Sequence, residues 1–220
     1  LHYPLRRQRQ MCIRDRVTGE AMSDYFKRLH QHHGVEVVTG CEVTAINGQG
    51  SVSEVITADD QSFAADMVIV GIGVVPETEL AEQAGLRLDN GIAVDAQART
   101  SQTDIYAAGD CSSHPSALYH RSIRLESVQN ANDQSRVAAA NMCGDDQMYT
   151  ATPWFWSDQF DVKLQSAGLC EGYDETSVEG DVSPENSEGF VIKYFRQGKL
   201  IAADCINRPK DFMAIKNSLA

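Results

Sequence analysis

The sequence has few basic residues and no long apolar run. Its 19 lysines and arginines stand against 31 aspartates and glutamates, a net charge of −12. This balance argues against non-specific nucleic-acid binding, which needs a basic face. No run approaches the roughly 18 apolar residues of a membrane helix, and no charged-then-apolar secretory leader occurs. We therefore expect a cytoplasmic protein that binds neither nucleic acid nor membrane.

Closely spaced cysteine pairs are missing as well. Cys143 and Cys170, the nearest two of the six cysteines, are 27 residues apart, so neither a local redox dithiol nor a zinc knuckle is indicated. Without an export signal, we interpret all six as reduced thiols, mostly small core residues. His30, His32 and His33 have no carboxylate placed beside them, which favours exposed residues at a helix end over a metal site.

The chain is long enough to bury a substantial core. Of its 220 residues, 42% are hydrophobic and 23% are charged, which suits one large or two modest domains. Residues 1–16 stand apart, with five arginines, one acid and no helix or strand period. We interpret them as a leader foreign to the rest of the chain and expect them to pack against nothing.

Helical spacing follows the leader, over residues 21–33. The apolar side chains fall on one stripe, Ser23 could cap the helix, and Gly34 ends it. A β region is expected to begin at Val35–Val38 and to continue as an alternating meander. The helix stripe consists of Met22, Tyr25, Phe26 and Leu29, and the expected strands of the meander are residues 42–46, 52–58 and 62–63.

A continuous apolar run, Met67–Val70, predicts a buried parallel strand. Gly71 and Gly73 come directly after it and permit close approach of another backbone or a ligand. An ordinary strand that ends in a glycine turn explains the same residues, because a lone Gly-x-Gly is a weak signal. Ile72 lies between the two glycines, and Pro76 fixes the direction of the chain beyond them.

The stretch from Thr100 to Asp110 predicts a second buried strand, Ile105–Ala108, that ends in a glycine and a carboxylate. Gly109 allows a turn that a Cβ would obstruct. Asp110 would then lie at the carboxyl end of a strand, where open α/β sheets bind their ligands. Its carboxylate suits a ribose or polyol hydroxyl, whereas the simpler alternative is a turn capped by an aspartate.

Further elements precede the last part of the chain. They are a helix over residues 77–84, a strand over 91–95, a loop over 111–124 and a helix over 126–142. Ser127 or Glu126 could cap the last of these helices, and the unpaired N–H groups of its first turn would stabilise negative charge. The side chains expected to pack on a sheet are Val128, Ala131, Val137, Ala138 and Ala140.

The last part, after a linker over residues 144–152, predicts an antiparallel sheet with one terminal helix. Trp154 and Trp156 are expected on opposite faces of the first strand, with Trp156 toward a cofactor; two ordinary core tryptophans are the alternative. The expected strands are residues 154–158, 162–167, 175–179, 189–196 and 200–206, and the helix begins near Pro209 with the stripe Phe212, Met213, Ile215 and Leu219.

Three of these stretches resemble one family. Thr100–Asp110 resembles the second flavin-binding motif of flavoprotein reductases that carry two dinucleotide-binding domains. Leu125–Ala131 and Pro153–Gln159 resemble the NADH-dependent ferredoxin reductases of oxygenase and P450 systems. The resemblance covers residues 17–220. It implies an α/β fold, a partial two-dinucleotide-binding-domain (Rossmann-like) flavoprotein followed by an α+β C-terminal interface domain.

The resemblance also implies the cofactors, FAD and NAD(P)H. Asp110 would bind the ribityl chain of FAD. Hydride from NADH would reach the flavin, and electrons would leave singly to a [2Fe–2S] ferredoxin or a rubredoxin. No side chain need act as nucleophile or general acid, so no catalytic residue is predicted. The residues implied for FAD are Gly109, Asp110, Ser127, Val128 and Trp156, and those implied for the nicotinamide nucleotide are Gly71, Ile72 and Gly73.

The family's two glycine-rich phosphate loops do not occur in the 220 residues. We therefore expect the C-terminal half of a reductase. Its expected parts are the leader 1–16, NAD-binding residues 17–75, FAD-binding residues 76–150 and an interface domain over 151–220. The alternatives are a related flavoprotein, such as an NADH oxidase or the flavin domain of a nitrite reductase, and an inert fragment. Pro153–Gln159 argues against the related flavoproteins.

Overall fold

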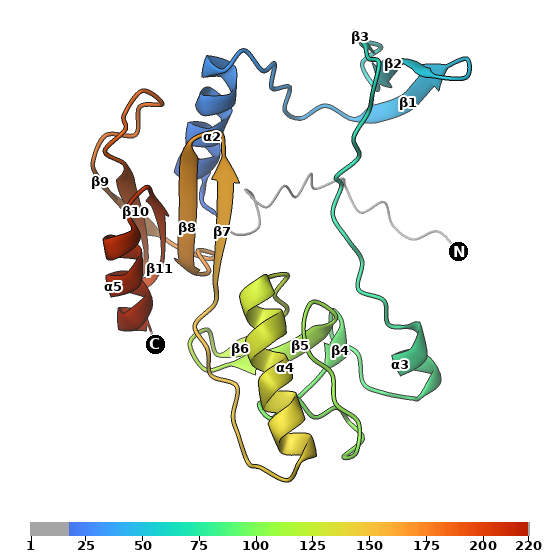
Figure 1. The fold of residues 1–220 in the computed structure, drawn as a ribbon, viewed down its shortest axis with the longest axis vertical. Coiled ribbons are helices and arrows are strands. Elements are labelled where there is room, and N and C mark those ends of the chain that lie inside the picture. Colours follow the sequence, from blue (N-terminus) through green and yellow to red (C-terminus); the bar gives the residue numbers. More distant parts are fainter. Residues whose placement is uncertain (1–17, 220) are drawn as a thin grey trace. The chain divides into compact units, whose positions relative to one another are not determined.

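The computed structural model describes residues 18–219. The chain forms two compact units that join between Gly73 and Val74. The first unit contains helix α2 and strands β1 to β3, and the second contains the elements from α3 to α5 (Figure 1). The leader expected over residues 1–16 lies outside the described residues.

The first unit begins with helix α2, Glu20–His32. All four residues of the predicted stripe are at most 1% exposed, which confirms the amphipathic pattern. The N-cap is Gly19 and not Ser23, because Ser23 already lies inside the first turn and its N–H donates to the Gly19 carbonyl over 3.1 Å. Gly34 follows the helix with a φ of +78°, a left-handed conformation that suits glycine at a helix end.

The predicted meander is confirmed as an antiparallel sheet in the order β1-β2-β3. Its strands are β1 (Val43–Gly48), β2 (Val52–Thr57) and β3 (Ser62–Ala64). Val35–Val38, expected to begin the β region, is not a strand. No described strand pairs with it, and apolar residues alone do not supply the hydrogen bonds of a ladder.

The apolar run Met67–Val70 does not form the predicted buried strand. It is not assigned to any strand, and Ile69 is 88% exposed. A central parallel strand needs a hydrogen-bonded partner on each side, and no strand among residues 18–219 pairs with this run. The prediction was wrong because an apolar run indicates a strand suited to burial but does not show that adjacent strands are present to bury it.

The second unit begins with helix α3, Glu79–Gln83, which precedes a small sheet. Strands β4 (Ile92–Ala93) and β5 (Ser112–Ser116) run parallel, and β5 forms an antiparallel hairpin with β6 (Arg121–Ile123). Helix α4, Val128–Met142, lies beside this sheet (Figure 1). Residues 111–124 therefore form a hairpin and not the predicted loop, because hydrogen bonding overrides their low apolar content.

The segment before β5 is a turn-rich loop and not the buried strand predicted for Ile105–Ala108. Its one ladder contact is an isolated bridge between Tyr106 and Arg99, and Ile105 is 40% exposed. As with Met67–Val70, no strand in the described part of the chain provides a partner on either side. Asp110 therefore follows a loop and not the carboxyl end of a strand.

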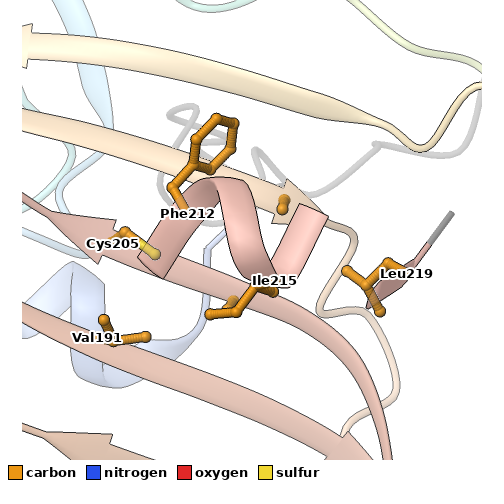
Figure 2. Close-up of a cluster of buried hydrophobic side chains, with 7 residues drawn as sticks. Val191, Cys205, Phe212, Ile215 and Leu219 are labelled. Carbon is orange, nitrogen blue, oxygen red and sulfur yellow. The ribbon is translucent and has the colours of Figure 1, made fainter. Parts of the chain in front are cut away.

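The C-terminal part is a five-stranded antiparallel sheet covered by helix α5, Pro209–Leu219. Phe212 and Ile215 of α5 pack with Val191 and Cys205 of the sheet (Figure 2). All five predicted strands are confirmed. Met213 is 50% exposed, because it lies about 100° around the helix from Phe212. The strands are β7 (Trp154–Gln159), β8 (Val162–Gly168), β9 (Glu175–Glu179), β10 (Phe190–Arg196) and β11 (Lys199–Ile206), in the order β7-β8-β11-β10-β9.

Candidate functional site

Gly109 lies in a turn that is fastened to helix α4. Its φ of +84° is in the left-handed region, which glycine adopts without the strain that a Cβ brings. Its N–H donates to Oε1 of Gln134 over 2.8 Å, and the Ser112 hydroxyl donates to the same oxygen over 2.8 Å. The Ser112 N–H also donates to the Gly109 carbonyl over 3.0 Å. A buried amide side chain thus holds the turn against α4.

The Asp110 side chain is exposed, and its carboxylate has no hydrogen-bond partner among residues 18–219. The alternative interpretation, an aspartate that caps the turn, is not supported, because Ser112 and the Gly109 carbonyl close the turn. A free carboxylate on an ordered backbone can accept hydrogen bonds from the hydroxyl groups of a ligand. The geometry therefore leaves Asp110 available for the role predicted for it.

Arg124 joins the Asp110 turn to the residues that lead into α4. Its side chain is only 3% exposed, and its Nη1 donates to the Asp110 carbonyl over 3.0 Å and pairs with Oε1 of Glu126 over 2.7 Å. Gly91 makes room for this arrangement, since a Cβ there would lie 3.1 Å from Cδ of Arg124 and 2.6 Å from the Cys111 carbonyl oxygen. A buried guanidinium with both contacts fixes the spacing between the turn and the helix.

Replacement of Arg124 by glutamine is expected to lower the free energy of unfolding by about 2 kcal/mol, because its buried, charge-assisted contacts with the Asp110 carbonyl and with Glu126 are lost. Denaturant unfolding of variant and parent measures the difference. The control is Arg136→Gln, which removes an ion pair whose arginine is 78% exposed and should have little effect. Equal unfolding free energies for parent and Arg124→Gln would mean that Arg124 holds nothing in place.

The first turn of α4 offers unpaired backbone donors. Ser127 is the N-cap, and its hydroxyl accepts a hydrogen bond from the Asn130 N–H over 3.1 Å, which confirms one of the two predicted caps. The N–H groups of Val128 and Gln129 have no partner among the described residues, and the Val128 side chain is 58% exposed. Together with the helix dipole, these groups favour negative charge at this end of α4.

The buried face of α4 is polar, contrary to the prediction of small and branched residues there. Ala138 is the one predicted side chain that is buried. Several of these amides bond to one another or to the loops, as where the Tyr149 hydroxyl donates to Oδ1 of Asn130 over 3.0 Å, whereas Oε1 of Gln129 and Nε2 of Gln134 are buried with no partner among the described residues. Sequence reasoning missed these residues and Arg124, although Asn130, Gln134 and Asn141 recur at helical spacing. The buried polar residues of α4 are Gln129, Asn130, Gln134 and Asn141.

Trp154 and Trp156 lie on the same face of β7, and the prediction of opposite faces was wrong. A strand alternates with a period of two, so residues i and i+2 share a face, and the two ring centroids are 5.6 Å apart. Trp154 packs on α5, with its ring 5.7 Å from the Phe212 ring and 4.8 Å from Nζ of Lys216. Trp156 is 45% exposed, so its indole is available to a cofactor.

The segment Gly71-Ile72-Gly73, predicted to bind the nicotinamide nucleotide, lies at the end of the first unit. A Cβ added at Gly71 or Gly73 would meet no atom within 4 Å, and Ile72 is 86% exposed. Gly73 has a φ of +93°, which favours glycine on conformational grounds. The role of these three residues toward a nucleotide stays a prediction.

Within residues 18–219, no three His, Cys, Asp or Glu side chains are grouped so that they could hold a metal ion, and no helix has the length and apolarity to cross a membrane. His114 is buried, and burial lowers its pKa to about 4, so it is neutral near pH 7.

Known proteins resemble this chain over most of its length. Residues 5–135 match the family described as pyridine nucleotide-disulphide oxidoreductase, and residues 154–220 match the reductase C-terminal family. A ferredoxin–NAD(P)(+) reductase of Sphingomonas sp is 44% identical over 201 residues, which are 90% of this chain and 48% of the relative. Putidaredoxin reductase CamA of Pseudomonas putida is 40% identical over 203 residues, 91% and 47% of the two chains.

The fold is shared with a solved structure, that of putidaredoxin reductase in its covalent complex with putidaredoxin. The TM-score is 0.87 at 39% sequence identity, over 92% of this chain and 49% of the other. This chain thus spans about half the length of the relatives it matches. The likeness confirms the expected fold class and the family resemblance. The chain belongs to the pyridine nucleotide-disulphide oxidoreductase family.

Proposed function

We propose that this chain is part of an FAD-dependent oxidoreductase that passes electrons from NADH through FAD to a ferredoxin-type iron–sulfur protein. One observation carries the proposal: the free carboxylate of Asp110 is held by a turn that is fastened to α4 near the helix's unpaired first-turn N–H groups. The chain's relatives include a ferredoxin–NAD(P)(+) reductase and putidaredoxin reductase. Their names set the class of reaction that we assign.

The residues of the site fit two parts of FAD. Asp110 offers an acceptor for ribityl hydroxyl groups, and Gly109 lets the backbone pass close to α4. The N–H groups of Val128 and Gln129 are placed to stabilise negative charge at the N1–C2=O edge of the ring. FAD, when bound, supplies the acceptance of hydride from NADH and the release of single electrons. The protein's part is to bind, orient and stabilise.

Trp156, with its exposed indole, would lie over the flavin ring and shield it from water, while Trp154 anchors the same strand on α5. Gly71, Ile72 and Gly73 would lie along the nicotinamide nucleotide. All five described cysteines are free thiols, which agrees with a reducing compartment and supports the cytoplasm as the location.

A direct assay tests the assignment of an iron–sulfur protein as the electron acceptor. The flavoprotein that contains this chain is mixed with NADH and either a [2Fe–2S] ferredoxin or a rubredoxin. Bleaching of the iron–sulfur absorbance in step with NADH consumption supports the reductase. NADH consumption that follows oxygen uptake, with neither redoxin reduced, would identify an NADH oxidase and overturn the proposal.

Replacement of Asp110 by alanine in that flavoprotein is expected to weaken FAD binding by roughly 1.5–3 kcal/mol, because charge-assisted hydrogen bonds to the ribityl chain are lost. Titration of the apoprotein, followed by flavin fluorescence, measures the dissociation constant. Asp104→Ala is the matched control, since Asp104 is an exposed carboxylate of the same loop. If the two variants bind FAD equally well, Asp110 is not a flavin ligand.

A further inference from the structure

Tyr119 connects the β5–β6 hairpin to the C-terminal sheet. It lies in the turn between the two strands of the hairpin and is half-buried. Its hydroxyl accepts a hydrogen bond from the Leu169 N–H over 2.6 Å and donates to the Ile201 carbonyl over 3.3 Å. Leu169 follows the end of β8, and Ile201 lies on β11, the neighbour of β8. One side chain therefore bonds both strands at the same end of the sheet.

The sheet is shaped to receive this hydroxyl. Gly168, the last residue of β8, has a φ of +78°, and a Cβ there would lie 3.0 Å from the Tyr119 oxygen and 2.3 Å from the Ile201 carbonyl oxygen. Burial raises the pKa of Tyr119 to about 12, so the hydroxyl keeps the proton that it donates. An exposed ion pair between Arg121 and Glu171 spans the same junction.

The hydrogen bonds of Tyr119 lie close to the start of β7. The Gly168 N–H donates to the Pro153 carbonyl over 2.8 Å, and Ala167 pairs with Trp154 in the ladder. The strand end that Tyr119 binds is therefore also the one that holds the first residues of β7. Trp156 lies two residues further along this strand, on the face shared with Trp154.

The linker before β7 is held from the other side by Tyr149. Its N–H donates to the Ala96 carbonyl over 2.7 Å, and its hydroxyl contacts Asn130 and Gln129 at the start of α4. Tyr149 thus fixes the linker to the helix, and Tyr119 fixes the sheet to the hairpin. Between these two points the start of β7 has little freedom to move relative to α4.

We propose that Tyr119 is a positioning residue that, through Leu169 and Ile201, holds the start of β7 and so sets where Trp156 lies relative to Asp110 and the first turn of α4. The functional consequence, that Tyr119 governs how well the Trp156 indole covers the flavin, rests on the proposed function. Its structural part depends only on the contacts of Tyr119 and is tested without flavin.

The first test uses Tyr119→Phe in the 220-residue chain. Trp154 and Trp156 are its two tryptophans, so tryptophan emission reports on β7 alone. Loss of the hydroxyl removes the acceptor of the Leu169 N–H, which should therefore exchange with solvent about tenfold faster, the effect of one lost hydrogen bond. The freer start of β7 should also raise the quenching of the tryptophan emission by acrylamide. Tyr106→Phe removes a hydroxyl bonded to Arg99 and Asn141 and should change neither signal. Equal behaviour of the two variants would overturn the proposal.

The second test uses Tyr119→Phe in the FAD-loaded flavoprotein that contains this chain. With Trp156 no longer held over the ring, flavin fluorescence should rise and the reduction of a redoxin should slow, while the small acceptor ferricyanide is reduced at the parent's rate. A change in tryptophan quenching without any change in flavin fluorescence keeps the positioning role and counts against the proposed flavin site. Arg121→Gln breaks the ion pair of the same junction and should change flavin fluorescence and redoxin reduction in the same direction by a smaller amount. If neither Arg121→Gln nor Tyr119→Phe changes these two signals or the tryptophan quenching, the positioning role of Tyr119 is refuted.

Discussion

A polypeptide of these 220 residues, supplied with excess FAD and NADH, is expected to oxidise NADH at least about 100-fold more slowly than putidaredoxin reductase assayed beside it. The reason is the lack of phosphate contacts. No Gly-x-Gly-x-x-Gly sequence occurs in the chain, and that motif supplies the tight turn and helix N-terminus that bind the pyrophosphate of a dinucleotide. Two lost charge-assisted hydrogen bonds of about 1.5 kcal/mol each already exceed a factor of about 100.

The exposed apolar run supports the same expectation. Met67, Ile69, Ile72 and Val75 are between 77% and 88% exposed, so the segment predicted to bind the nucleotide is not packed on any strand of the described residues. Such a segment favours association between copies of the chain over binding of a cofactor.

The assay follows NADH absorbance with ferricyanide as the acceptor, on the fraction that elutes as a monomer. Putidaredoxin reductase provides the active reference, and tryptophan emission shows that the C-terminal sheet is folded in the sample. Turnover within a few-fold of the reference would mean that Asp110 and α4 bind FAD productively without a glycine-rich loop, and the expectation would fail.

The stability of the C-terminal sheet is expected to fall as the pH rises from about 4 to about 7 because of Asp204. This carboxyl group is 1% exposed, and burial raises its pKa to about 7 although Ser166 and Tyr194 donate hydrogen bonds to it. In the unfolded chain it titrates near about 3.9. Because the folded pKa is the higher one, the contribution of this group is fully present below about pH 4 and is lost toward pH 7, at about 1.4 kcal/mol per pH unit.

Asp204→Asn removes the titrating group, so the difference in unfolding free energy between variant and parent should shift in favour of the variant by about 4 kcal/mol between pH 4 and pH 8. Denaturant unfolding, followed by tryptophan emission from β7, measures it at each pH. Asp158→Asn, at a side chain that is 58% exposed on the same sheet, should give a flat difference. If the difference for Asp204→Asn is also independent of pH, folding does not raise the pKa of Asp204.

Local patterns predicted the C-terminal sheet well. Each of its strands pairs with a partner that the chain itself provides through antiparallel hairpins or a nearby crossover, as in β10 with β11. The stripe of α2 and the cap Ser127 were likewise predicted, because a helix forms its hydrogen bonds within itself. The error at Trp154 and Trp156 was one of reasoning, since the period of two already places both on one face.

Tertiary contacts decided the remainder of the site. Ile105–Ala108 and Met67–Val70 have the composition of central strands, but a strand needs hydrogen bonds from neighbours, and the described chain provides none for them. Loops distant in sequence supply many of the hydrogen bonds of the polar face of α4, as the Gly109 N–H does for Oε1 of Gln134.

By itself the sequence determined where the residues proposed for the flavin site occur: Gly109 and Asp110 in one motif, Ser127 and Val128 at a helix start, and Trp156 in a strand. Only the tertiary structure decided what holds them together, namely Arg124 between the Asp110 turn and α4 and Tyr119 between the hairpin and the sheet. The physical reason is that side-chain hydrogen bonds between distant segments depend on distance and direction in space, which no local period encodes.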